Sequence, residues 1–85
     1  MKARGDGNIQ SVQGIITPSD WDVNFNVIAV KISAPEEKEY LVKKTVKGMS
    51  LMAHTQKILR VVGRLSGDNK GNTIIEVEDF EPVNG

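Results

Sequence analysis

The chain of 85 residues has no cysteine, no long hydrophobic run and only four aromatic residues, and its charges cancel. The absence of cysteine excludes disulfides, thiolate chemistry and cysteine-based zinc sites. The longest apolar run, residues 27–30, is far too short to span a bilayer as a helix. With 39% hydrophobic and 26% charged residues, the composition is that of a globular protein. A chain of this length forms a single domain with one core.

No targeting signal is visible, because the first fourteen residues lack the apolar segment of a signal peptide. Met1 and the polar residues 2–8 fit a natural start as well as a chain cut after a removed leader. The sequence therefore leaves the compartment open, with a slight preference for the cytoplasm. We expect a flexible segment over residues 1–8, a single domain over residues 9–82 and a tail over residues 83–85.

Charge is unevenly distributed along the chain although its net value is zero. Residues 31–64 hold eight basic side chains against three glutamates, and residues 65–85 hold one lysine against five acidic side chains. Such an asymmetry can produce a basic face, which is what a polyanion needs. The alternative is a solvated surface of mixed charge, and a neutral domain argues against strong, salt-driven DNA binding.

Short segments with alternating apolar residues predict five β-strands. They cover residues 9–17, 24–33, 39–43, 58–65 and 73–80. Turn chemistry separates them, with Pro18 expected to end the first strand and residues 34–37 expected to form a hairpin turn. Gly14, in the middle of the first strand, indicates a bulge or a tight bend.

Residues 45–54 break the alternation and predict one short helix near residues 46–53. Val46, Met49, Met52 and Ala53 follow helical spacing, and Thr45 is placed to act as the N-cap. Gly48 weakens such a helix by about 1 kcal/mol relative to alanine.

The element order therefore predicts an all-β fold, a five-stranded OB-fold-like barrel with one short helix between strands 3 and 4. Closure into a barrel removes the exposed edges that five short strands would otherwise leave. The predicted core consists of the inward residues of these strands. They are Val12, Ile16, Ile28, Val30, Ile32, Val42, Leu59, Val61, Ile75 and Val77.

The pattern also resembles small bacterial OB-fold domains of the tRNA-anticodon-binding-like type, over nearly the whole chain. The matching pieces are Val12, Gly14 and Ile16, then VIAVKI (27–32), YLV (40–42), KGMSL (47–51), RVVGRL (60–65) and IIEV (74–77). These pieces are hydrophobic and glycine patterns shared by many functions, so they bear on the fold more than on an activity. The resemblance implies a ligand surface on strands 2 and 3 and the adjoining loops.

Enzyme signatures are missing, and we predict no catalytic residue, no metal site and no cofactor. The chain has no nucleophile elbow, no phosphate-binding loop and no dinucleotide-binding glycine pattern. His54 stands alone, without a second polar group at a meaningful spacing. Asp20 with Asp22 and Glu76 with Glu78 offer too few oxygens for a calcium loop.

The candidate binding residues are two aromatic side chains beside the first loop and the cations near them. They are Trp21, Phe25, Lys31, Lys38, Lys43, Arg60, Arg64 and Lys70. Bases stack on aromatic rings while lysine and arginine meet phosphates, so we predict non-catalytic binding of single-stranded nucleic acid. The alternative is a protein- or oligosaccharide-interaction module, in one version part of an exported assembly. Trp21 and Phe25 remain open between ligand contact and core packing.

Overall fold

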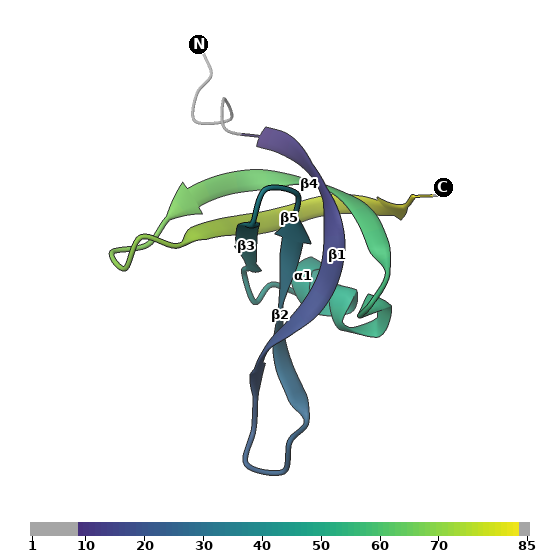
Figure 1. The fold of residues 1–85 in the computed structure, drawn as a ribbon, viewed down its shortest axis with the longest axis vertical. Coiled ribbons are helices and arrows are strands. Elements are labelled where there is room, and N and C mark those ends of the chain that lie inside the picture. The colour runs from purple at the N-terminus through teal and green to yellow at the C-terminus, as the bar shows by residue number, and fades with distance from the viewer. Residues whose placement is uncertain (1–8, 84–85) are drawn as a thin grey trace.

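Five strands close into a barrel in the order β1-β2-β3-β5-β4 in the computed structural model, which describes residues 9–83 (Figure 1). The strands are β1 (Ile9–Trp21), β2 (Val27–Ala34), β3 (Lys38–Val42), β4 (Ile58–Gly67) and β5 (Thr73–Pro82). All neighbours are antiparallel except β3 and β5, which run parallel. The predicted fold class is confirmed: the fold is all-β, with a five-stranded barrel and one short helix between the third and fourth strands. The expectations for residues 1–8 and 84–85 lie outside the described residues.

β1 is four residues longer than predicted, because Pro18 does not end it. β1 pairs with β4 up to Ile15 and with β2 from Ile15 to Trp21. Pro18 therefore lies where β1 has β2 as its only strand neighbour, and proline is tolerated at such an edge. The register shifts twice between Pro18 and Trp21. The backbone N–H that proline lacks is not needed at this edge, so the strand continues past Pro18.

Gly14 marks a close approach of two strands rather than a bulge. The pairing of β1 with β4 runs through Gly14 without a register shift, while β1 curves over the barrel (Figure 1). A Cβ atom at this position would lie 2.5 Å from the carbonyl oxygen of Ser33 in β2. The missing side chain therefore lets β1 cross β2 closely where it changes partner.

The hairpin predicted at residues 34–37 is confirmed. Glu36 and Glu37 join β2 to β3 with φ angles of 65° and 61°, and two successive left-handed residues are typical of a type I′ turn. β2 starts at Val27, three residues later than predicted, and residues 22–26 belong to the preceding loop. Both β4 and β5 extend two residues beyond their predicted ends.

The helical segment consists of α1 (Val46–Met49) followed by a 3₁₀ helix, η2 (Ser50–His54). The N-cap prediction is confirmed, since the backbone N–H of Gly48 donates to Thr45 Oγ1 at 3.0 Å. The residues whose spacing predicted the helix are not the ones it buries: Val46 is 93% exposed, whereas Gly48 and Leu51 are buried. The helix tightens after one turn, so its buried positions are three residues apart.

The barrel interior holds a single apolar core. Its buried residues are Val12, Ile16, Val30, Ile32, Val42, Leu51, Leu59, Val61, Ile75 and Val77. Nine of the ten predicted residues are confirmed; Ile28 is only half-buried, and Leu51 was not predicted. Within residues 9–83, neither helix is long and apolar enough to cross a membrane.

Candidate functional site

Residues 17–30 form a two-stranded arm that projects from the barrel (Figure 1). In this hairpin arm β1 has lost β4 as a neighbour, because that pairing ends at Ile15. β2 has not yet gained β3, because that pairing begins at Lys31. The loop at the end of the arm is therefore held by the two strands of the arm alone.

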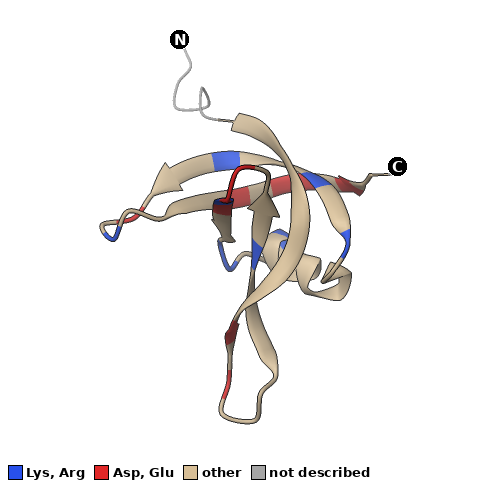
Figure 2. Cartoon of the chain, in the orientation of Figure 1, with Lys and Arg blue, Asp and Glu red and all other residues tan. Residues whose placement is uncertain are grey.

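The end of the hairpin arm carries three large apolar side chains in solvent. Trp21 is 51% exposed, Val23 92% and Phe25 85%. The open alternative is thereby decided for both aromatic residues: neither Trp21 nor Phe25 packs in the core. Asp20 and Asp22 are their charged neighbours, and Figure 2 shows acidic but no basic residues at this end. We call Trp21, Val23 and Phe25 the arm tip.

Asp22 holds the loop of the arm in one shape. Its Oδ1 accepts hydrogen bonds from the backbone N–H groups of Asn24 at 2.8 Å and Asn26 at 3.0 Å, and its Oδ2 accepts from the Asn26 side chain at 3.2 Å. The N–H of Phe25 donates to the Asp22 carbonyl at 3.0 Å. The bonds from Asn26 are the main reason why the pKa of Asp22 is lowered from its ordinary value of 3.8.

The loop between β4 and β5 repeats this arrangement bond for bond. Oδ1 of Asp68 accepts from the N–H groups of Lys70 and Asn72, each at 2.9 Å, and Oδ2 accepts from the Asn72 side chain at 3.0 Å. Gly71 donates to the Asp68 carbonyl, as Phe25 does to that of Asp22. Both loops are three-residue hairpin connections whose last residue is left-handed. That residue is Gly71 in one loop, with φ 87°, and Phe25 in the other, with φ 67°.

Acid should loosen both loops. Their hydrogen bonds lower the pKa of Asp22 and Asp68 below 3.8, so the stability that they provide is complete above that pH and is lost as pH falls through the folded-state pKa. We expect the amide signals of Asn26 and Asn72 to titrate in NMR spectra with midpoints below pH 3.8. The variants Asp22→Asn and Asp68→Asn serve as controls, since each should abolish the titration in its own loop only. Midpoints at or above 3.8 would contradict the prediction.

Most of the cations predicted to bind phosphates lie beside carboxylates. The ion pairs are Lys31 with Glu39 at 2.8 Å, Lys43 with Glu76 at 3.7 Å, Arg60 with Glu81 at 2.6 Å and Arg64 with Glu78 at 3.7 Å. In Figure 2, basic residues of β4 lie next to acidic residues of β5. Arg60 and Arg64 of the basic middle are therefore neutralised by Glu81 and Glu78 of the acidic end across these two strands. Lys38 and Lys70 have no ion pair within residues 9–83.

A hollow of about 390 Å³ lies where the hairpin arm leaves the barrel. Its lining includes the apolar side chains of Ala29, Leu41 and Ile74, together with Lys43 and Lys44. We call it the arm hollow. Lys43 is the only one of these five residues that was predicted from the sequence to contact a ligand. The sequence signal that could have identified the arm hollow was the pair of adjacent lysines, Lys43 and Lys44, directly after the third strand.

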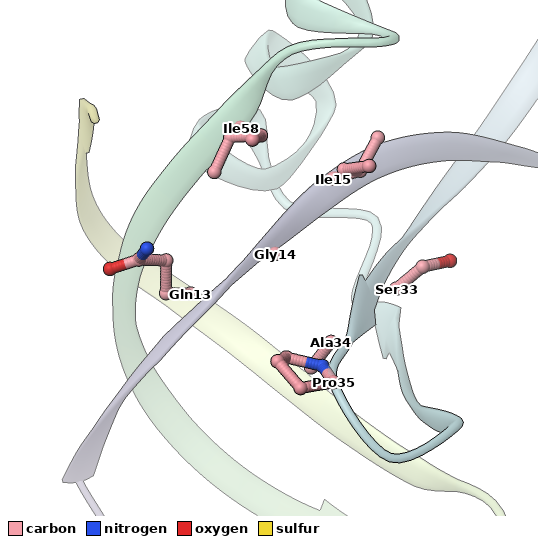
Figure 3. Close-up of a pocket in the computed structure, with 7 residues that line it drawn as sticks. All are labelled: Gln13, Gly14, Ile15, Ser33, Ala34, Pro35 and Ile58. Carbon is pink, nitrogen blue, oxygen red and sulfur yellow. The ribbon is translucent and has the colours of Figure 1, made fainter. Parts of the chain in front are cut away.

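A second hollow, of about 370 Å³, lies at the point where β1 changes partner (Figure 3). Gln13, Gly14, Ile15, Ser33, Ala34, Pro35 and Ile58 line it. Ile15 and Ile58 are 40% and 46% exposed. None of its lining residues is an acid, a base or a nucleophile of the kind that hydrolases use, apart from the hydroxyl of Ser33. The Ser33 hydroxyl shares a hydrogen bond with Thr17 at 3.1 Å.

His54 has a packing contact rather than a chemical partner. Its ring lies edge-on to Phe80, with 5.3 Å between the centroids. In the described part of the chain, no three His, Asp or Glu side chains are grouped so that they could hold a metal ion. Comparison of the chain with protein-family models, curated proteins and solved structures gave no match. The hairpin arm is therefore the feature from which a function is inferred below.

Proposed function

We propose that the protein is a non-catalytic binding domain that docks on a partner protein through the arm tip. The observation that carries this proposal is the conformation and exposure of Phe25. Phe25 occupies a left-handed position that costs a residue with a Cβ atom about 1–2 kcal/mol, and it is exposed to solvent. The equivalent position of the matching loop is a glycine.

The comparison of the two loops separates folding from function. Both loops make the same set of hydrogen bonds, so glycine at position 25 would serve the fold at least as well as phenylalanine. Strained residues of this kind are concentrated at binding sites. A large aromatic ring beside Trp21 and Val23 is the type of anchor that dominates the energy of protein interfaces.

The charge around the arm tip indicates the partner class. Asp20 and Asp22 would repel phosphates, and four of the predicted phosphate-binding cations are already paired with carboxylates. A partner surface that is apolar and basic complements an apolar tip with two carboxylates. The proposal therefore departs from the single-stranded nucleic acid favoured by the sequence. The strand order and the position of the helix support the resemblance to OB-fold domains, which remains part of the proposal.

Site-specific photocrosslinking tests the proposal directly. Phe25 is replaced by the aromatic photocrosslinker p-benzoylphenylalanine in living cells, and Asn69 of the matching loop is replaced in a parallel control. We expect a discrete protein adduct from position 25 and none from position 69. Equal adducts from both positions, or none from position 25, would overturn the proposal.

Single-stranded nucleic acid is the second candidate, supported by the exposed rings and by Lys43 and Lys44 in the arm hollow. Trp21 is the only tryptophan, so its fluorescence reports on the arm alone. We expect no quenching by oligothymidylate at low salt, where phosphate binding is strongest. Saturable quenching that weakens with added salt would instead favour nucleic acid.

Exchanging the residues of the two loops should separate stability from binding. Phe25→Gly should raise the free energy of unfolding by about 0.5–1 kcal/mol, because relief of the left-handed strain exceeds the added chain entropy of glycine. Gly71→Phe should lower it by about 0.5–1 kcal/mol, since no atom lies within 4 Å of a Cβ atom there and the backbone strain is partly offset by the lost chain entropy of glycine.

Urea denaturation measures both changes, and crosslinking from position 23 reports on docking. Phe25→Gly should abolish the adduct from position 23, while Gly71→Phe should leave it intact. A destabilised Phe25→Gly variant would show that the ring supports the fold.

A further inference from the structure

The two edges of the hairpin arm are protected very differently. The β1 edge has Pro18 and Asp20, both of which hinder the addition of another strand. The β2 edge has residues 27–30, which are all apolar and contain no proline and no charge, while the two register shifts of the pairing involve both strands. These residues have no strand partner on the side of β3, because that pairing begins at Lys31.

The arm hollow borders this unpaired edge. Its lining includes the consecutive residues 29 and 30 of β2, the consecutive residues 41–44 at the end of β3, and residues 19 and 20 of β1. Consecutive residues of a strand point to opposite faces of the sheet. The hollow therefore reaches from the arm across the unpaired edge of β2 to the end of β3, beside the place where a further strand would continue the sheet.

We propose that an extended segment of the partner protein pairs with the β2 edge along residues 27–30. This inference rests on the proposed function and names the form in which the partner binds. Main-chain hydrogen bonds provide affinity in this mode, and pockets for alternate side chains provide specificity. One apolar side chain of the segment occupies the arm hollow, against Ala29, Leu41 and Ile74.

The charge of the hollow specifies the next side chain of the segment. Lys44 has no ion pair within residues 9–83, and the Lys43 side chain is 58% exposed, with its ammonium 3.7 Å from the Glu76 carboxylate. Asp20 is the one carboxylate among the lining residues, so the two lysines leave the hollow with a surplus of positive charge that an acidic side chain on the bound segment would complement. The segment therefore combines apolar residues at alternate positions with a carboxylate at the end that meets Lys43 and Lys44.

Selection of peptides by the full chain tests this inference. A display library of random nine-residue peptides is selected on the immobilised protein, and affinities are measured by calorimetry. We expect enriched peptides with alternating apolar residues and a nearby Asp or Glu. Lys44→Glu should weaken their binding about tenfold, the size of a lost charge-assisted contact. Lys70→Glu, an exposed lysine in the matching loop, should leave it unchanged.

N-methylation of the selected peptides tests the strand pairing itself. Methyl groups at alternate positions should each weaken binding about tenfold by removing a main-chain hydrogen bond, and those between should have little effect.

Uniform effects, or no enriched peptide at all, would overturn the strand pairing. If Phe25→Gly loses affinity for the peptides but all methyl groups have the same effect, docking through the arm tip is supported and strand pairing is rejected. If methylation has alternating effects and Phe25→Gly leaves the affinity unchanged, strand pairing is supported and docking through the arm tip is rejected. A dimer of the protein alone, with residues 27–30 protected from hydrogen exchange, would assign the edge to a second copy and overturn the peptide partner.

Discussion

Replacing Leu51 by alanine should cost about 2–5 kcal/mol of unfolding free energy, the range for truncating a fully buried leucine. Leu51 is 0% exposed and enters the core from η2, which packs against β1 and β2. No side chain from a strand can fill the cavity left by the truncation, because the inward-facing residues of the strands already occupy other parts of the core. In a domain of this size, each 1 kcal/mol lowers the Tm by about 4–8 °C.

Met52→Ala is the matched control for this prediction. Met52 is the next residue of η2, is only half-buried and packs at the margin of the core. Its truncation should cost less than half as much as that of Leu51 in urea denaturation. A larger loss at Met52 than at Leu51 would mean that η2 presents a different face to the barrel.

The register of the strands was predictable because side chains alternate with a period of two. Once Val61 is assigned to the core, Leu59 follows it inward and Arg60 points to solvent, and the structure confirms all three. The same reasoning placed Ile16, which is 0% exposed, through nothing more than its spacing from Val12. One correct inward residue fixes the face of a whole strand.

Features that depend on the neighbour of a segment were not predictable in this way. Pro18 was expected to end β1, since proline cannot donate to a ladder. Whether that donor is needed depends on which strand lies beside β1, and the sequence does not show that β4 leaves at Ile15. The burial of Leu51 was missed for a related reason, because it depends on the tightening from α1 to η2, which the spacing of the residues does not show.

The candidate site was predictable in its residue types and not in its electrostatics. The aromatic residues of the first loop were identified, and their exposure was left open because a tryptophan can also close the end of a barrel. The surplus of basic over acidic residues was identified along the sequence, where it is present in residues 31–64. Its neutralisation arises from the pairing of β4 with β5, which sets Arg60 opposite Glu81. Charge that is separated in sequence is adjacent in the sheet.

The second large effect concerns Gly63, where alanine should lower the free energy of unfolding by about 1–3 kcal/mol, as overpacking does. Gly63 is buried in β4 beside the register shift after Val62. A Cβ atom there would collide with the carbonyl oxygen of Glu76, a backbone atom that no rotamer change can move, and would lie 2.8 Å from Ile75 Cγ1.

Gly67→Ala in the same strand supplies the control for Gly63→Ala. The nearest atom to a Cβ at Gly67 is 3.8 Å away, and the φ angle lies outside the left-handed region. Alanine there should be neutral or stabilising by about 0.4–1 kcal/mol, because it restricts the unfolded chain. Both substitutions restrict the unfolded chain equally, so the difference between their denaturation midpoints measures the close approach of β4 to β5 alone. Equal midpoints would mean that the two strands can separate at Gly63 without loss, and that the barrel is not closed tightly at this position.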